Sequence, residues 1–224
     1  GGLNATADPA TATLIVTDDS DGVPADIEDQ APNNGDGNDD GIPDRIQDDV
    51  ASLPTFDDDG FITVAITNGC DQLNNVIALS PTSQPLFPEN LEFSFGLVGF
   101  ELPCESAIVD VIFAGDTALL GNRYFKFAPT TPGQAVSADW FDFSDPPAGA
   151  TTGATLSGNV WTLTLADNQL GDATGDDGVI VDPGGPAQQF VAIPFVTPMI
   201  LLLMAAILGI MGLIATSRSR IDKV

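Results

Sequence analysis

The feature that most constrains this chain is an apolar segment near its C-terminus. No residue between Asp182 and Arg218 is charged, and Met199 to Ala215 contains no strongly polar side chain. As a helix, this stretch would span roughly 26 Å, close to the thickness of the hydrocarbon core of a bilayer. Pro198 suits its first turn, because the missing N–H would be unpaired there anyway. We predict a transmembrane helix over residues 198–216 after a linker over 188–197; the alternative is a buried helix of a soluble protein.

The charges that flank this helix predict its orientation. Arg218, Arg220 and Lys223 follow it, and cationic tails remain on the cytoplasmic side of a membrane. We therefore expect a cytoplasmic tail over 217–224 and an extracytoplasmic, periplasmic domain before the helix, in a bacterial inner membrane. Because no signal sequence opens the chain, we expect a mature form from which the signal peptide was removed.

Small residues within the predicted helix suggest a second role for it. Ala205 and Gly209 are four apart, as are Gly212 and Thr216, and such spacing lets helices approach closely in lipid. The helix is therefore either a packing element for a partner helix or a passive anchor.

The overall composition excludes several classes of function. The chain has 32 Asp and Glu against 6 Lys and Arg, no His, and a net charge of −26. Such a surface repels phosphate backbones, so nucleic acid is not an expected partner. Without imidazole, Ser-His-Asp and Cys-His nucleophile systems and His-ligated metal sites are also excluded.

The two cysteines favour a disulfide. Cys70 and Cys104 are 34 residues apart, which is too far for a CxxC redox or metal motif. An oxidising compartment outside the membrane favours pairing them. The alternative is two separate buried thiols.

A short internal repeat lies near the N-terminus. Residues 22–29 (GVPADIED) recur 19 positions later as residues 41–48 (GIPDRIQD). The copies share Gly, a β-branched residue, Pro, Ile and Asp in register. We interpret the shared apolar positions as surfaces through which the two loops pack on each other.

The acidic residues around this repeat have the spacing of calcium ligands. Alternating oxygen-bearing side chains in a tight loop converge on one centre, Gly41 permits the sharp turn, and Ca²⁺ prefers about six to eight oxygens. In the first copy Thr17 and Ala25 replace Asp36 and Asp44, and nearby acids are expected to compensate, Asp18 among them. A solvated acidic linker is the alternative. The candidate ligands are Asp36, Asn38, Asp40, Asp44 and Asp48 for the second loop, and Asp19, Asp21, Asp26 and Asp29 for the first.

A third acidic loop contains Asp172, Asp176 and Asp177 between glycines. It is either a further cation site or a polar hairpin turn. The sequence favours neither interpretation.

The region between the repeats and the linker has a β pattern. β-Branched and aromatic residues alternate or cluster over residues 61–67, 91–97, 107–113, 123–127 and 160–165, with Gly, Pro, Asp and Asn between them. Short strands at such spacing predict a mainly β fold, an antiparallel β-sandwich over 55–187.

Two groups of side chains could suggest carbohydrate chemistry. Trp140, Phe141, Phe143 and Trp161 could form a sugar-stacking platform, but their alternation favours core packing. Asp139, Asp142 and Asp145 could form a glycosidase pair only if two carboxylates converged across a cleft. We expect solvated acidic faces and no catalytic site.

Several of these segments carry a family resemblance. Residues 18–54, including 31–38 (APNNGDGN) and 50–54 (VASLP), resemble the thrombospondin type 3-like calcium repeat that precedes bacterial choice-of-anchor U domains. Segments within the following domain are similar to the recurring segments of that family: 95–98 (FGLV), 124–127 (YFKF), 140–143 (WFDF), Gly171 and 179–187 (VIVDPGGPA). The resemblance implies an N-terminal strand or tether over 1–17, calcium repeats over 18–54 and an anchored surface domain over 55–187.

The C-terminal segment is similar to an Ile-Pro-Thr-Leu sorting tail. Ile193 and Pro194 precede the apolar helix and the Arg-rich tail, but Phe195 and Val196 stand in place of Thr-Leu, and the usual Ser-Glu-Trp stretch is absent. This departure favours a standing membrane anchor over cleavage by a sorting protease.

Together these features predict a non-catalytic, calcium-stabilised structural protein at the bacterial surface, in contact with the lipid bilayer. One alternative is an accessory subunit of a larger membrane complex, joined to other subunits through the helix. A weaker alternative is an adhesive or glycan-binding module.

Overall fold

The computed structural model describes residues 18–131 and 138–190. The predicted tether (1–17), the anchor helix (198–216) with Ala205, Gly209 and Gly212, the tail (217–224) and most of the linker lie outside the described residues. Within the described segments, no helix is long and apolar enough to cross a membrane. The chain divides into two compact units, Gly1–Phe190 and Val191–Val224, and the description below concerns the first.

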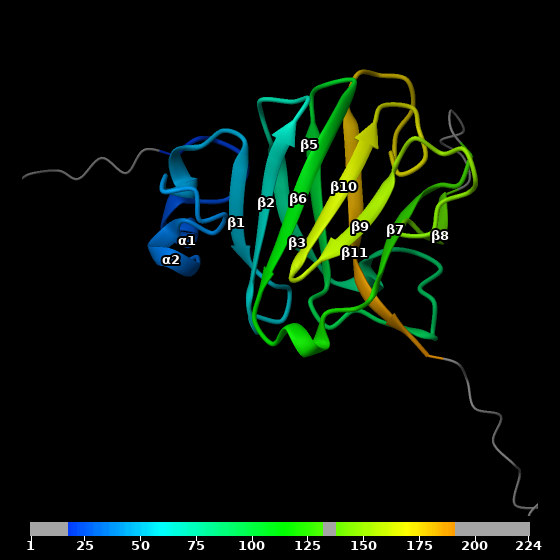
Figure 1. Cartoon of the computed structure of the whole chain (residues 1–224), viewed down its shortest axis with the longest axis horizontal. Coiled ribbons are helices and arrows are strands. Elements are labelled where there is room, and N and C mark those ends of the chain that lie inside the picture. Colours follow the sequence, from blue (N-terminus) through cyan, green and yellow to red (C-terminus); the bar gives the residue numbers. More distant parts are fainter. Residues whose placement is uncertain (1–17, 132–137, 191–224) are drawn as a thin grey trace, which may run out of the picture. The chain divides into compact units, whose positions relative to one another are not determined.

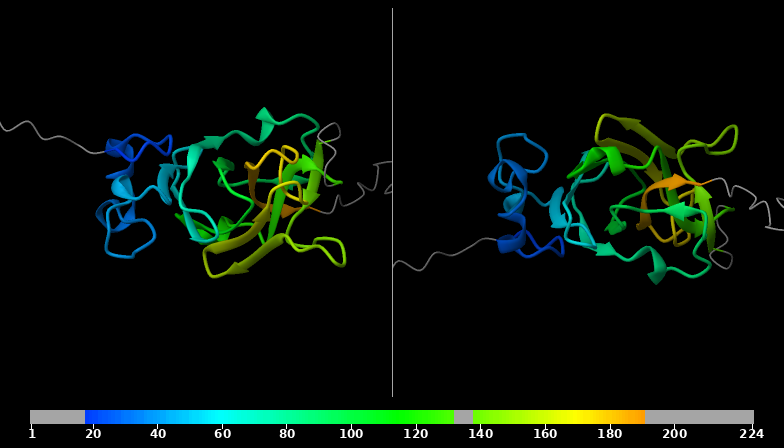
Figure 2. Two further views of the ribbon diagram at one scale, coloured as in Figure 1. Left: turned by 90° about the horizontal axis from the view of Figure 1, so that it is seen from above. Right: turned by 90° about the horizontal axis from the view of Figure 1, so that it is seen from below.

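Two antiparallel sheets form a β-sandwich (Figures 1 and 2), which confirms the predicted mainly β class. The first sheet has the order β1 (Val50–Pro54), β2 (Phe61–Asn68), β6 (Ser106–Ala114), β10 (Val160–Ala166), β9 (Gly153–Ser157). The second has the order β3 (Asn74–Leu79), β5 (Leu97–Leu102), β11 (Ile180–Gln189), β7 (Arg123–Pro129), β8 (Ala138–Asp142), and the short β4 (Leu91–Glu92) pairs with the end of β11. The short helical elements are α1 (Ala25–Glu28), α2 (Pro32–Gly35), η1 (Asp44–Ile46), η2 (Pro81–Ser83) and η3 (Thr117–Leu119).

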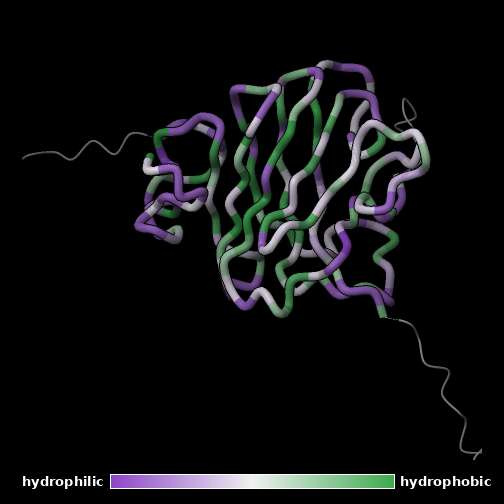
Figure 3. Tube along the Cα trace, viewed as in Figure 1, coloured by the Kyte–Doolittle hydropathy of each residue, from purple (hydrophilic) through white to green (hydrophobic). Residues whose placement is uncertain are grey.

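The core lies between the sheets and follows the alternation of the strands. Ala107, Val109, Val111 and Phe113 of β6 are buried, whereas the residues between them are more exposed, as expected for a strand with one face in the core. Apolar residues accordingly mark the strands in Figure 3, and polar ones mark the loops.

The four aromatics assigned to the core do pack inside or against it. Trp161 is 1% exposed and its ring centroid lies 5.5 Å from that of Tyr124. Phe143 is fully buried, and Phe141 packs against the same cluster. Trp140 packs on a second cluster around Phe93 and donates from Nε1 to the carbonyl of Pro85 over 3.0 Å.

Four of the five predicted strands fall within β2, β6, β7 and β10, but the prediction of one strand over 91–97 was wrong. β4 ends at Glu92 and β5 begins only at Leu97. Between them Gly96 adopts a φ of +71°, and its N–H donates to the carbonyl of Phe93 over 3.1 Å. This left-handed turn, which glycine adopts readily, separates the two strands.

The sequence pattern did not predict β11, which is the middle strand of the second sheet. Its residues 182–186 (DPGGP) have the composition of a turn. Tertiary pairing overrides that preference: residues 180–184 pair with β5 and residues 184–187 with β7. Each flanking strand thus pairs with only part of β11. Pro183 and Pro186 have no N–H to donate, and each lies where β11 pairs with one of the two strands, so the missing N–H groups are tolerated.

The predicted disulfide is present. The Cys70 and Cys104 sulfur atoms are bonded, and their Cα atoms lie 5.9 Å apart. Cys70 lies in the connection from β2 to β3, and Cys104 in the connection from β5 to β6. Since each connection passes from one sheet to the other, the bond links two crossings of the sandwich.

Residues 18–49 dock against the sandwich beside β1 (Figure 2). The N–H groups of Ile66, Leu73 and Val76 donate to the carbonyls of Asp49, Asp48 and Asp21 over 2.9, 2.8 and 3.1 Å. The next residues, 50–54, were assigned to the calcium repeats from the resemblance, but they form β1 and pair with β2.

The apolar residues of the repeat behave differently in its two copies. Val23 is buried in the main core and Ile27 packs against it. The equivalent Ile42 and Ile46 are 46% and 48% exposed. The shared apolar positions therefore do not pack on each other as predicted: those of the first copy pack on the sandwich, and those of the second stay largely exposed. The two copies are in contact through other groups, including the ion pair between Asp29 and Arg45.

Candidate cation-binding site

The two copies of the repeat adopt the same local backbone structure. Asp21 Oδ1 accepts from the N–H of Val23 over 2.7 Å, and the equivalent Asp40 Oδ1 accepts from that of Ile42 over 2.8 Å. The intervening Gly22 and Gly41 have φ values of +113° and +91°, a region that glycine enters without steric cost. The sequence repeat is thus a structural repeat.

The second loop brings four of its predicted ligands together. Asp36 accepts from the N–H groups of Asp40 and Gly41 over 3.0 and 2.9 Å, and Asp44 accepts from Gly37 over 2.8 Å. Asn38 Nδ2 donates to Asp40 Oδ2 over 3.1 Å. The carboxylates of Asp36 and Asp40 also raise the pKa of Asp44. The fifth candidate of this loop, Asp48, is exposed and acts instead on the pKa of Asp19.

In the first loop, Asp18, Asp19 and Glu28 each offer a carboxylate oxygen, and these oxygens lie within 4.8 Å of one another. Glu28 was not among the candidate ligands predicted from the sequence. Ala25 and Glu28 lie three apart on the single turn of α1 and both are buried, because positions i and i+3 share a helix face. In the sequence, the three-residue spacing of Ala25 and Glu28 after the apolar Val23 could have indicated that Glu28 faces the protein interior.

The other candidates of the first loop lie elsewhere. Asp26 is exposed. Asp29 forms an ion pair with Arg45, with 2.7 Å between its Oδ1 and the Nε of Arg45. Asp21 is buried and belongs to the same cluster electrostatically, since its charge acts on Glu28.

Buried carboxylate oxygens without partners define the candidate site. Asp21, Glu28 and Asp44 are at most 1% exposed. One oxygen of each, and Oδ2 of Asp19, receives no hydrogen bond from the described part of the chain. The other Glu28 oxygen, Oε1, accepts from the N–H of Ser52 over 3.2 Å. Buried polar oxygens are normally satisfied, so these four are free to coordinate a cation.

Burial perturbs the pKa of each of these acids. It raises the pKa of Glu28 to about 9, with the charge of Asp21 adding to the effect, and it raises that of Asp21 to about 7. The pKa values of Asp19 and Asp44 are also raised, mainly by burial. The charges of Asp21 and Asp19 in the first loop and of Asp44 in the second all add to the raised pKa of Glu28.

Two buried hydroxyl groups of the first sheet lie against the second loop. Ser52 of β1 and Thr63 of β2 are paired residues, and their buried hydroxyls lie 2.6 Å apart. Gly37 sits directly above them, where an added Cβ would collide with both hydroxyls. The outer face of β1 and β2 thus carries a polar pair at the point that Gly37 of the second loop covers.

The third acidic loop is held by its own backbone. Asp172 is buried and accepts from the N–H groups of Asn168, Thr174 and Val181 over 3.0 to 3.1 Å. Asp176 and Asp177 are exposed. Asp172 thereby fixes the entry into β11, while Oδ1 of Asp167 and Oδ1 of Asn168 have no hydrogen-bond partner in the described part of the chain.

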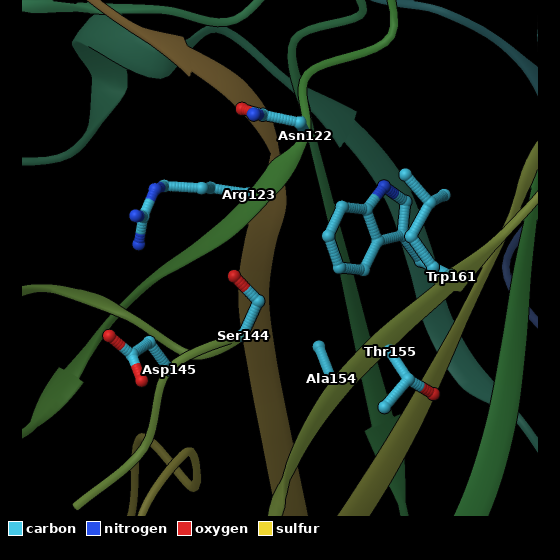
Figure 4. Close-up of a pocket in the computed structure, with 8 residues that line it drawn as sticks. Asn122, Arg123, Ser144, Asp145, Ala154, Thr155 and Trp161 are labelled. Carbon is cyan, nitrogen blue, oxygen red and sulfur yellow. The ribbon is translucent and has the colours of Figure 1, made fainter.

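A surface pocket beside β7, β9 and β10 is lined by few side chains that could act in catalysis (Figure 4). It is lined by Asn122, Arg123, Ser144, Asp145, Ala154, Thr155, Leu156 and Trp161. Asp145 is its one carboxylate. Asp142 is ion-paired with Arg123 and accepts from Ser144, and Asp139 is exposed. The three acids considered for a glycosidase thus do not present two free carboxylates across this pocket.

Comparison with family models, curated proteins and solved structures finds no match for this chain. The resemblance to choice-of-anchor U proteins and their calcium repeats therefore stays a prediction.

The raised pKa values predict an unusual pH dependence of the cation-free protein. Above about pH 4 the folded state holds protons on Asp21 and Glu28 that the unfolded chain has released, so stability falls as pH rises. We expect the melting temperature in chelator to decrease progressively through pH 7 and towards pH 9, where these two groups ionise. Thermal unfolding across this range is the measurement. A melting temperature that rises from pH 5 to 9 in chelator would contradict it.

Proposed function

We propose that this protein is a non-catalytic structural protein of the bacterial surface, stabilised by Ca²⁺ and held in the inner membrane by a C-terminal helix. The observation that carries the proposal is the set of buried carboxylate oxygens on Asp19, Asp21, Glu28 and Asp44 that have no hydrogen-bond partner in the part of the chain that the structure describes. Such groups are costly unless they are protonated or bind a cation.

The donor set favours calcium among the common metals. All candidate ligands are carboxylate, amide or backbone oxygens, and hard cations prefer oxygen. Flexible loops that combine several carboxylates suit the larger, irregular coordination sphere of Ca²⁺ better than the strict octahedron of Mg²⁺. Asp18, Asp19, Asp21 and Glu28 would hold one ion, and Asp36, Asn38, Asp40 and Asp44 a second.

Bound calcium would fix the N-terminal segment as a rigid extension of the sandwich. The loops attach to β2, Leu73 and β3 through three backbone hydrogen bonds, to β1 through the Glu28 carboxylate, and to the core through Val23 and Ile27. Neutralising the clustered carboxylates removes the repulsion that opposes this docking. An anchored domain with a rigid extension would have a structural role. The pocket in Figure 4, which has few side chains suited to catalysis, agrees with that role.

Calcium titration of the full chain in detergent tests this proposal. We expect the melting temperature to rise with Ca²⁺ above its value in chelator, because an ion that binds only the folded state stabilises it. Heat of binding should be measurable by calorimetry, and Mg²⁺ should be less effective. Glu89→Gln, which changes an exposed acid outside both loops, is the matched control and should behave as wild type. Equal melting curves in calcium and chelator would overturn the proposal.

A further inference from the structure

A buried lysine and a buried aspartate meet inside the sandwich. Lys126 lies on β7 and Asp182 on the neighbouring β11, where Lys126 pairs with Gly184. Both side chains are completely buried, and Lys126 Nζ lies 2.9 Å from Asp182 Oδ2. Because alternate residues of a strand share a face, Asp182 and Gly184 both face the core beside Lys126.

This contact is close but is not a satisfied ion pair. By distance the two atoms form a salt bridge, yet within the described segments Nζ and both carboxylate oxygens lack a hydrogen bond of good geometry. Two buried charges need good geometry and additional hydrogen bonds to offset their desolvation. As a pair of ions, Lys126 and Asp182 would therefore destabilise the fold.

The surroundings favour the uncharged forms of both groups. Nζ lies 4.7 Å from the centroid of the Phe143 ring, and the buried Tyr124 hydroxyl has no hydrogen-bond partner among residues 18–131 and 138–190. Burial lowers the pKa of Lys126 and raises that of Asp182. Transfer of one proton within the pair then leaves a free amine beside a neutral carboxylic acid. These are the two forms that condense to an amide.

The backbone leaves room for the pair to approach. A Cβ on Gly184 would lie 2.7 Å from Tyr124 Cε1, 3.0 Å from Asp182 Oδ1 and 3.1 Å from Lys126 Cγ. Any larger residue would therefore push these side chains apart. Asp172 is a second buried carboxylate whose charge acts on both partners, and its own oxygens are fixed by backbone N–H groups.

We propose that Lys126 and Asp182 form an intramolecular isopeptide bond that covalently joins β7 to β11. The Lys126 amine attacks Cγ of the neutral Asp182 carboxyl group, and a bond forms between Nζ and Cγ. The bond between Cγ and one carboxyl oxygen breaks. That oxygen leaves as water, carrying the carboxyl proton and one proton from Nζ. No oxidant, metal or second substrate is required.

The bond would explain why two unsatisfied polar groups are retained in the core. The amide removes both charges and leaves one N–H and one carbonyl, which are cheaper to bury. It also joins the middle strand of the second sheet to its neighbour β7. Together with the disulfide between Cys70 and Cys104, it would give the sandwich two independent covalent cross-links.

Intact-mass measurement of the full chain, purified in detergent with the disulfide reduced, tests the proposal. We expect a mass lower than that of the sequence by one water, and fragmentation should identify a branched peptide that contains Lys126 and Asp182. Asp182→Asn is expected to react in the same way with loss of ammonia, which gives a product of the same mass as the wild-type product. Lys126→Met should have its full calculated mass.

Two controls separate this bond from other losses of water. Asp142→Asn removes the carboxylate of the partly buried Arg123 pair and should still lose water. A succinimide at an Asp-Gly sequence would also lose water, but that loss would persist in Lys126→Met. Wild-type protein of full mass, or a loss of water retained in Lys126→Met, would overturn the proposal. The wild-type measurement decides the question even if Lys126→Met fails to fold.

Discussion

Replacing Glu28 by Gln is expected to change stability in opposite directions with and without calcium. In chelator at pH 8, the variant should be more stable than wild type by about 1 to 3 kcal/mol, because it no longer buries an acid that must retain a proton. Gln keeps an oxygen for the N–H of Ser52 and adds donors towards Asp19 and Asp21. In saturating Ca²⁺ the order should reverse, because a carboxylate ligand has been lost. We expect the apparent calcium affinity to fall about tenfold or more.

Chemical denaturation in both conditions, together with calorimetric titration, measures these effects. The reversal of sign is the informative result, since a simple packing defect would destabilise the protein in both conditions. Glu89→Gln should leave both values unchanged. If Glu28→Gln bound calcium as tightly as wild type, Glu28 would not be a ligand.

Removing the disulfide should cost about 4 kcal/mol of unfolding free energy on the loop-entropy model. The Cys70–Cys104 bond closes a loop over a sequence separation of 34 residues. It joins the connection from β2 to β3 with that from β5 to β6. Without it, the unfolded chain gains conformational freedom, while the folded sandwich keeps its core.

The double variant Cys70→Ser, Cys104→Ser, followed by denaturant unfolding in saturating Ca²⁺, measures this effect. Wild type unfolded under reducing conditions is the matched control, and the two should give the same free energy. If the double variant unfolded at the wild-type midpoint under oxidising conditions, the bond would not restrict the unfolded chain as argued.

Local patterns account for the parts of the fold that could be predicted. β10 alternates buried apolar residues with the outer Thr162 and Thr164, and β6 is rich in β-branched residues; one strand reveals either pattern by itself. The repeat at residues 22–29 and 41–48 fixed the turns at Gly22 and Gly41, since the geometry of each turn depends on a few adjacent residues. The cysteines were paired correctly because the chain has only two.

The prediction failed where neighbours in space, and not in sequence, decide the structure. β11 has the composition of a turn, yet β5 and β7 supply hydrogen-bonding partners on its two sides. Glu28 appeared to be one acid among many, and only the docking of α1 against β1 buried it beside Asp19. Asp29 seemed an equally good candidate ligand. It pairs instead with Arg45, which comes close to Asp29 only because the chain folds back after α2.

The sequence by itself determined the β class, the paired turns of the repeat, the disulfide and the strong negative charge, because these depend on composition and short-range order. Only the tertiary structure decided which carboxylates are buried without partners, and that Lys126 and Asp182 meet in the core. Burial and contact between residues 56 positions apart (126 and 182) arise when the sheets pack. The electrostatic cost of a charge depends on that packing and not on the residue alone.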